Sequence, residues 1–225
     1  MNIKPIAVIH NKFRSKFGIP RQSGLAKCAK SKIIFEPEYR VNDAVRGLEE
    51  FTHLWLIWQF SKTAEREWTP TVRPPRLGGN KRVGVFATRS PYRPNSLGLS
   101  SVRLDKIDFN CPESPVIYVT GVDLLDGTPI YDIKPYLKYA DMHEDASDGF
   151  ALSEDKSLEV EFAPGLLELI PKDEREAITE LLAGDPRPGY QNDPNRVYGI
   201  TYGEINIKFK IKDGTAIVTK IETED

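Results

Sequence analysis

The chain has 225 residues, of which 40% are hydrophobic and 28% charged, and its formal net charge at pH 7 is −2. This composition is ordinary for a globular protein with one large domain, or with a main domain and a small companion. No run approaches ~18 apolar residues and the first residues lack a long apolar core, so we expect neither a membrane-spanning helix nor a signal peptide. Cys28 and Cys111 have no local cysteine partner, which argues against a metal site or a disulfide framework and favours the reducing cytoplasm.

The charge is unevenly distributed along the chain. Residues 1–109 carry 20 Lys and Arg against 9 Asp and Glu, whereas residues 110–225 carry 11 against 24. No acidic residue precedes Glu36, and none lies between Glu67 and Asp105. Either the two halves complement each other across an internal interface, or the first half presents a basic face to a polyanion such as nucleic acid.

The first 140 residues are predicted to form mainly strands, each rich in β-branched or aromatic residues and bounded by Gly, Pro, Asn or Asp. The predicted strands are residues 3–10, 31–39, 52–60, 81–89, 99–109 and 114–125. Residues 42–51 predict one helical turn with Asn42 as its N-cap. Because so few helices separate the strands, the fold class is mainly β, an antiparallel sheet or barrel. The Pro- and Arg-rich stretch 67–80 is predicted to be a long connection, and such connections often carry function.

The composition changes at residues 140–157, which are acidic, poor in large apolar side chains and predicted to be a linker. A strand over 159–162, a helix over 171–184, an alternating stretch over 196–211 and a hairpin turn at Asp213-Gly214 are predicted beyond it. These features predict a β domain over residues 1–145 and a small α+β domain over residues 146–225.

The common catalytic templates are absent from the sequence. It contains no GxGxxG after a strand, no GxxxxGK[ST], no HExxH and no GxSxG. His10, His53 and His143 are scattered, and His53 heads an apolar run where a structural role is expected. The sequence therefore predicts neither a hydrolytic triad nor a zinc site.

Two Pro-containing loops, residues 17–27 and 87–100, carry side chains that donate hydrogen bonds. These side chains are Arg21, Gln22, Arg89, Arg93 and Asn95. Prolines lower the entropy of holding such donors in place, which favours a preformed anion pocket. An ordinary surface turn would have the same composition, so the residues alone leave both interpretations open.

Two later segments have a similar character. In residues 123–141, the turn from Asp126 to Pro129 offers a carboxylate and a hydroxyl. Asp132 and Lys134 are expected to form an ion pair. The tyrosines of this segment either pack on the barrel or stack on bases: Tyr131, Tyr136 and Tyr139. In residues 184–199, Arg187 lies between two prolines with Tyr190 nearby, which suits phosphate contact and stacking, or else a helix-exit turn. Together the four segments indicate an anionic, nucleotide-bearing ligand without specifying a reaction.

Five motifs in this order, IPRQSGL, VRPPRLGG, ATRSPYRPNSLGLS, DLLDGTPIYDIKPY and DPRPGY, resemble a family of bacterial and archaeal tRNA N6-methyltransferases. The resemblance implies a single-sheet rolled β-barrel with a small C-terminal domain, acting as a cytoplasmic homodimer. It implies S-adenosylmethionine as the methyl donor and N6 of threonylcarbamoyladenosine, next to the anticodon of tRNA, as the acceptor. No metal is implied. Ser61, where relatives often have histidine, and Ser96-Leu97 depart from the family pattern.

The resemblance also implies roles for individual residues. Those expected to bind the cofactor are Pro20, Arg21, Gln22, Ser61, Lys62, Arg89, Leu99, Asp126, Gly127, Thr128 and Pro129. Those expected to contact tRNA are Arg73, Arg76, Arg93, Asp185, Arg187, Pro188 and Tyr190. For catalysis, our hypothesis is that Asp126 or Tyr131 assists loss of the N6 proton while Arg93 and Asn95 hold the nucleotide. The alternatives are a regulator that binds nucleotide or RNA on the same barrel without catalysis, and a methyltransferase acting on another small acceptor.

Overall fold

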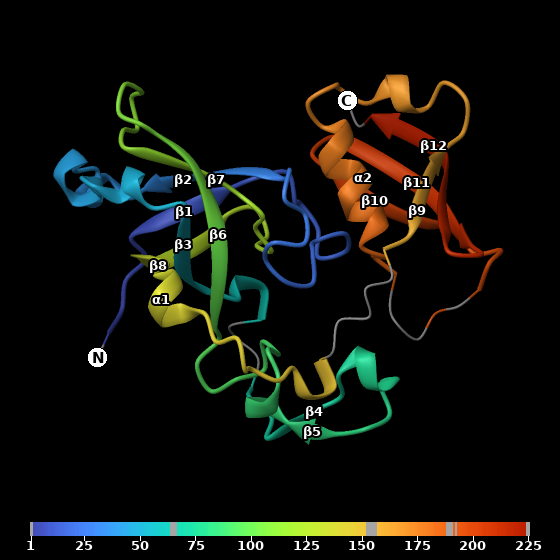
Figure 1. Ribbon diagram of the computed structural model, residues 1–225, viewed down its shortest axis with the longest axis horizontal. Helices are drawn as coiled ribbons and strands as arrows, with labels where there is room; N and C mark the ends of the chain where they lie inside the picture. Colours follow the sequence, from blue (N-terminus) through green and yellow to red (C-terminus); the bar gives the residue numbers. More distant parts are fainter. Residues whose placement is uncertain (1, 64–66, 152–156, 188–190, 192, 224–225) are drawn as a thin grey trace.

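The computed structural model describes residues 2–63, 67–151, 157–187, 191 and 193–223. Figure 1 shows two parts side by side: strands of the first half of the chain on one side, and a smaller unit of sheet and helix that contains the C-terminus on the other. Over these described ranges, no helix combines the length and the apolar character needed to cross a membrane.

Six antiparallel strands close into a barrel in the order β1-β2-β7-β6-β3-β8. Their bounds are β1 (Ala7–His10), β2 (Lys30–Phe35), β3 (His53–Gln59), β6 (Leu97–Asp108), β7 (Val116–Thr120) and β8 (Thr128–Pro135). Strand β1 pairs with β2 on one side and with β8 on the other, so this sheet has no free edge. Along β3, Leu54, Leu56 and Trp58 are buried and alternate with partly exposed residues, as expected for a strand with one face on the core. The prediction of a mainly β fold built on a barrel is confirmed.

The connection between β3 and β6 corrects one strand prediction. Residues 81–89 form only the two-residue strand β5 (Val83–Gly84), paired with β4 (Thr71–Val72), and then a 3₁₀ turn over Val85–Ala87. The barrel closes without them because β8, which was not among the predicted strands, supplies the sixth strand. Residues 67–96 therefore form an excursion from the barrel, seen at the bottom of Figure 1.

The helical turn predicted over residues 42–51 is also different from the expectation. The segment forms two 3₁₀ turns, Asn42–Val45 and Leu48–Glu50, and Val41 rather than Asn42 occupies the N-cap position. Gly47, at φ 83°, separates the two turns in a left-handed conformation that a longer helix could not contain. Further 3₁₀ turns cover Pro37–Tyr39, Ser61–Thr63, Pro75–Leu77, Gly149–Ala151 and Leu167–Leu169.

The C-terminal unit is a four-stranded sheet with one helix against it. Its elements are β9 (Glu159–Phe162), α2 (Arg175–Ala183), β10 (Tyr198–Tyr202), β11 (Ile205–Lys212) and β12 (Thr215–Thr223), with sheet order β10-β11-β12-β9. The alternating stretch 196–211 is two strands rather than one, because the chain turns at Gly203 (φ 62°). The turn at Asp213-Gly214 is confirmed, with both residues at positive φ as a two-residue hairpin requires. Helix α1 (Lys138–Asp141) begins before the predicted linker and overlaps only its first residues.

The two parts share one hydrophobic core. The backbone N–H of Gly203 donates to the carbonyl of Lys12 at 2.8 Å, and the ring of Phe13 meets that of Tyr202 edge-on at 5.6 Å. Lys12 forms an ion pair with Glu174, and Arg14 lies 3.6 Å from Glu204. These two pairs join basic residues of the first half to acidic residues of the second, so part of the charge asymmetry serves an internal interface.

Candidate functional site

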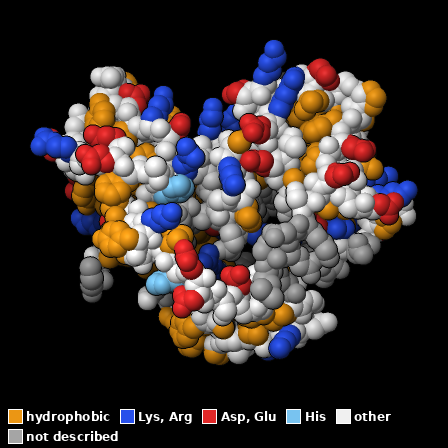
Figure 2. Space-filling view, viewed as in Figure 1, with side chains coloured by type: hydrophobic (Ala, Val, Ile, Leu, Met, Phe, Trp, Pro, Cys, Tyr) orange, Lys and Arg blue, Asp and Glu red, His pale blue; other side chains and the backbone are white. Residues whose placement is uncertain are grey.

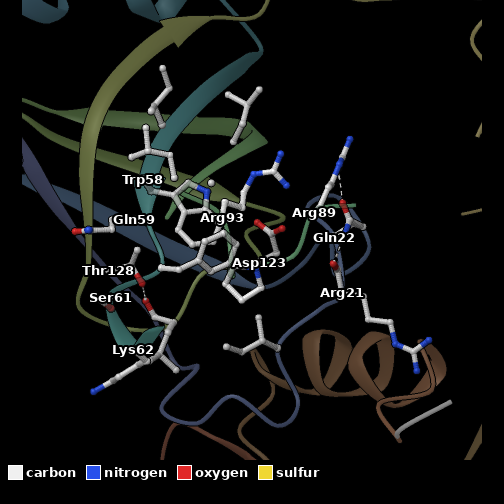
Figure 3. Close-up of a pocket in the computed structure, with 18 of the residues that line it drawn as sticks. Arg21, Gln22, Trp58, Gln59, Ser61, Lys62, Arg89, Arg93, Asp123 and Thr128 are labelled. Carbon is white, nitrogen blue, oxygen red and sulfur yellow. Dashed lines mark hydrogen bonds between the residues drawn. The ribbon is translucent and has the colours of Figure 1, made fainter. Parts of the chain in front are cut away.

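A cavity of about 690 Å³ lies where β3 and β6 meet the loops around residues 16–22 and 88–93 (Figure 3). Its volume is in the range typical of small-molecule sites. Its wall includes nine residues that the sequence analysis selected: Pro20, Arg21, Gln22, Ser61, Lys62, Arg89, Arg93, Leu99 and Thr128. Segments far apart in the sequence therefore converge on one space.

The remaining predicted cofactor and catalytic residues are not among the residues that line this cavity. These are Asn95, Asp126, Gly127, Pro129 and Tyr131. The carboxylate of Asp126 accepts a hydrogen bond from the backbone N–H of Asn11 at 3.0 Å and lies 3.6 Å from Nδ1 of His10. The hydroxyl of Tyr131 donates to Oε1 of Gln59 at 2.7 Å, and Gln59 does line the cavity. Tyr131 is thus connected to the wall through one side chain.

The described wall of the cavity is strongly cationic. Its charged side chains are Lys16, Arg21, Lys62, Arg89 and Arg93, all positive, and Asp123 as the single carboxylate. Such a wall attracts an anionic group, and the arginines can hold a carboxylate or phosphate with two parallel hydrogen bonds.

Asp123 is a site residue that the sequence analysis missed. Its Oδ1 accepts a hydrogen bond from Ser100 Oγ at 2.6 Å, and Ser100 Oγ in turn accepts one from the indole N–H of Trp58 at 2.9 Å. Burial raises the pKa of the Asp123 carboxyl, although the bond from Ser100 and the charge of Arg89 oppose that rise. One signal was available in the sequence, because Asp123 is a lone acid between the apolar residues Val122 and Leu124.

An apolar section of the wall is formed by Trp58 and Phe60, whose ring centroids are 4.3 Å apart. The indole of Trp58 lies directly over Gly98 on the paired strand β6, and a Cβ atom at position 98 would overlap the six-membered ring. A flat apolar surface of this kind suits a heteroaromatic ligand. Glycine at position 98 is therefore required by the close approach of the indole.

We expect Gly98→Ala to lower the free energy of unfolding by about 1–3 kcal/mol, because the added methyl forces Trp58 out of its position. Urea unfolding followed by tryptophan fluorescence measures this change. Gly84→Ala is the matched control, since a Cβ there meets nothing within 4 Å and φ is negative. Equal stability of the two variants would show that the indole can move without cost.

The loop over residues 87–93 is held by its own arginines. Arg93 donates to the carbonyls of Thr88 at 2.6 Å and Val85 at 3.3 Å, while its guanidinium lies over the ring of Phe86. Arg89 donates to the side-chain carbonyl of Gln22, which belongs to the other Pro-containing loop (Figure 3). The arginines therefore join the two loops to each other and to the cavity, rather than projecting from an isolated surface turn.

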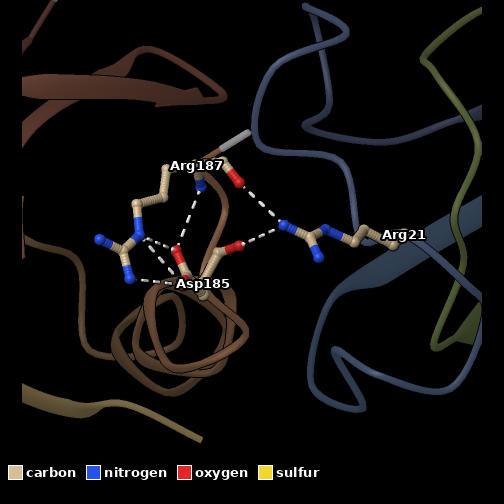
Figure 4. Close-up of polar contacts among 3 residues, drawn as sticks. All are labelled: Arg21, Asp185 and Arg187. Atoms are coloured by element: carbon tan, nitrogen blue, oxygen red, sulfur yellow. Dashed lines mark hydrogen bonds and ion pairs between the residues drawn. The ribbon is translucent and has the colours of Figure 1, made fainter. Parts of the chain in front are cut away.

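Arg21 connects the cavity to the C-terminal unit. Its Nη2 donates to the backbone carbonyls of Asp185 at 3.1 Å and Arg187 at 2.8 Å (Figure 4). Asp185, at φ 48°, accepts hydrogen bonds from the Arg187 guanidinium at 2.9–3.1 Å. Pro188 and Tyr190, also predicted to contact tRNA, lie outside the described residues. The DPRPGY motif thus begins beside a side chain that lines the cavity.

The other predicted features occupy different positions. Arg73 is exposed in the excursion and does not line the cavity, and the backbone at position 76 lies in the 3₁₀ turn Pro75–Leu77. The predicted ion pair between Asp132 and Lys134 is confirmed at 3.0 Å. Figure 2 shows Lys and Arg side chains interspersed with acidic ones, so the face in view is not a continuous basic patch. In the part of the chain that the structure describes, no three His, Cys, Asp or Glu side chains group to hold a metal ion.

Comparison with known proteins gives consistent matches along the chain. A family model described as the tRNA-methyltransferase O N-terminal domain matches residues 8–142, and one described as the TrmO C-terminal domain matches residues 155–224. The tRNA (adenine(37)-N6)-methyltransferase of Escherichia coli is 41% identical over 226 residues, covering 96% of each chain. A Pseudomonas aeruginosa protein, 39% identical over 92% of this chain and 90% of its own, has a name that assigns it to the S-adenosylmethionine-dependent methyltransferases. The crystal structure of TrmO from Pseudomonas aeruginosa superposes with a TM-score of 0.81 at 30% identity, covering 99% of this chain and 98% of that one.

Proposed function

This chain belongs to the TrmO family, and from that premise we propose that it methylates N6 of threonylcarbamoyladenosine beside the anticodon of tRNA, using S-adenosylmethionine. The activity of the family, stated without the specific substrate, is S-adenosylmethionine-dependent methylation of a tRNA adenine at N6. The observation that supports a site for it here is the cavity in which the IPRQSGL, ATRSPYRPNSLGLS and DLLDGTPIYDIKPY motifs converge.

The composition of the cavity suits this cofactor. An adenine needs an apolar surface such as that of Trp58 and Phe60, and a methionine carboxylate needs a cation such as Arg89. We propose the following residues as cofactor contacts: Pro20, Arg21, Gln22, Ser61, Lys62, Arg89, Leu99 and the turn Asp126, Gly127, Thr128 and Pro129. In that turn, the Asp126 carboxylate is proposed to accept from the ribose hydroxyls. When bound, the cofactor supplies a methyl group already activated by its sulfonium.

The chain must then orient the acceptor. The N6 lone pair is delocalised into the purine and the carbamoyl group, so loss of the N6 proton as the N6–methyl bond forms assists the transfer. We propose that Asp126 or Tyr131 assists that loss, and that Arg93 and Asn95 hold the nucleotide. Alignment supplies much of the remaining rate, which is the reason to build the site on loops cross-linked by Arg93 and by the Arg89–Gln22 pair.

For tRNA binding we propose contributions from both parts of the chain. Residues 1–145 would hold the cofactor, and residues 146–225 would contact tRNA through the DPRPGY motif. The proposed contacts are Arg73, Arg76, Arg93, Asp185, Arg187, Pro188 and Tyr190. We further propose that the protein acts as a homodimer in the cytoplasm, where its tRNA substrate is found; sedimentation equilibrium tests the dimer.

The proposed function is tested with labelled S-adenosylmethionine and two tRNAs that differ only in the threonylcarbamoyl group. We expect label to enter the modified tRNA and not the unmodified one. Equal labelling of both tRNAs would refute threonylcarbamoyladenosine as the specific substrate. The assignment as a tRNA adenine methyltransferase would still hold. Methyl transfer that does not depend on the anticodon-loop sequence would favour a methyltransferase acting on another small acceptor. Cofactor binding without any methyl transfer would favour a non-catalytic regulator.

A further inference from the structure

The charged side chains of the described cavity wall are nearly all positive. Asp123 is the one acid in the described wall, against five cations. A single acid among cations is expected to form an ion pair with one of them, yet no ion pair of Asp123 occurs within 4.0 Å among the described residues. Arg89 acts on Asp123 only as a nearby charge.

The Asp123 carboxylate is instead held by neutral donors. Ser100 Oγ donates at 2.6 Å and is itself fixed by the indole N–H of Trp58. These bonds set the orientation of the carboxylate without neutralising its charge. Burying a carboxylate that has no ion-pair partner costs free energy, so Asp123 is positioned to gain from a cation placed beside it.

We propose that Asp123 binds the positively charged part of the methionine portion of S-adenosylmethionine. The inference rests on the proposed function, which supplies this cofactor. The methionine portion carries two cationic groups, the α-ammonium and the sulfonium, and the five wall cations would repel either one. Asp123 supplies the one attraction that the described wall offers to them, while the nearby Arg89 remains available to the carboxylate of the same amino acid.

The test is isothermal titration of Asp123→Asn with three ligands and no tRNA. Asn keeps the shape and the hydrogen bond to Ser100 but removes the charge. S-adenosylmethionine should bind about 10- to 30-fold more weakly, the loss of one charge-assisted hydrogen bond. Methylthioadenosine, which keeps the adenosine and the thioether but has no cationic group, should bind within about twofold of its affinity for the unaltered protein.

S-adenosylhomocysteine distinguishes the two cationic groups, because it keeps the ammonium and lacks the sulfonium. If S-adenosylmethionine and S-adenosylhomocysteine lose affinity equally, Asp123 binds the ammonium. If only S-adenosylmethionine loses affinity, Asp123 binds the sulfonium. The proposal is overturned if S-adenosylmethionine binds unchanged, or if methylthioadenosine loses as much affinity. Asp132→Asn is the matched control, because Asp132 is a partly exposed aspartate outside the cavity.

Stability supplies an independent check on the variant. Because burial raises the pKa of Asp123, its ionised form opposes folding once the pH exceeds the ordinary carboxyl range. Asp123→Asn should therefore melt at the same temperature as the unaltered protein or higher, while binding the cofactor less well. A lower melting temperature, with methylthioadenosine affinity lost as well, would assign Asp123 to folding and overturn the proposal.

Should Asp123→Asn not fold at all, the unaltered protein provides the same test by pH. The other charged side chains of the described wall are Lys and Arg, which keep their charge as the pH is lowered into the carboxyl range. Lowering the pH toward the raised pKa of Asp123 should weaken the binding of S-adenosylmethionine and leave the affinity for methylthioadenosine unchanged. The proposal is overturned if the two affinities depend on pH in the same way. Failure of the unaltered protein to methylate tRNA would refute the proposed function, but these ratios would still be measurable.

Discussion

Replacing Arg89 with alanine is expected to lower the affinity for S-adenosylmethionine about 100-fold, the equivalent of two charge-assisted hydrogen bonds. Arg89 lines the cavity, and its guanidinium is already oriented by the side-chain carbonyl of Gln22. Such orientation reduces the entropy lost when the guanidinium takes up the methionine carboxylate. Titration calorimetry with the purified variant measures the change.

Two comparisons make this result specific to the carboxylate. Decarboxylated S-adenosylmethionine keeps both cationic groups, so its affinity should be nearly the same for Arg89→Ala and the unaltered protein. Arg103→Ala is the matched control, because Arg103 is exposed on β6 and does not line the cavity. If Arg89→Ala weakens both ligands equally, Arg89 supports the loop through Gln22 rather than binding the carboxylate.

Much of the barrel could be predicted from the sequence because strands that bury one face have a visible period of two. The run HLWLIWQ alternates buried and partly exposed residues along its whole length. The missed strand, β8, follows a turn signal and contains Pro129 and Pro135, which are poor strand indicators. The false strand over residues 81–89 has the right composition but no neighbour in the barrel, since β1 and β3 already pair with β8. Strand pairing is a property of the whole sheet and cannot be deduced from one segment.

The candidate site was predictable to a similar degree. Arg21 and Arg89 were selected because they lie with other hydrogen-bond donors in Pro-containing loops, and the family resemblance then implied that they bind the cofactor. Asp123 and Trp58 lie in or next to barrel strands, where an acid or an indole resembles core or edge composition. Only the folded arrangement shows that Trp58, Ser100 and Asp123 form one hydrogen-bonded chain in the cavity wall.

The prediction with the largest expected effect concerns the N6 proton. Asp126→Asn and Tyr131→Phe, combined in one variant, should lower the single-turnover rate of methylation about 100-fold or more, the usual contribution of a general acid or base. Single-turnover conditions with saturating cofactor separate this step from binding and product release. The two single variants show which group is responsible.

The structure makes the two single variants distinguishable. Tyr131→Phe removes the hydroxyl that holds Gln59 Oε1 at 2.7 Å, so it acts on the cavity wall through Gln59. Gln59→Leu, which removes the same contact from the other side, is therefore the matched comparison. Equal rates for Tyr131→Phe and Gln59→Leu would indicate positioning, whereas a slower Tyr131→Phe would indicate a direct role for the phenol.

Asp126 requires a different comparison, because its carboxylate accepts a hydrogen bond from the backbone N–H of Asn11 and lies near the ring of His10. If Asp126 takes the proton, Asp126→Asn should lower the single-turnover rate even at saturating cofactor. If it only binds the ribose, Asp126→Asn should raise the KM for the cofactor at an unchanged maximal rate. Near-normal single-turnover rates in both Asp126→Asn and Tyr131→Phe would leave neither residue a part in proton removal.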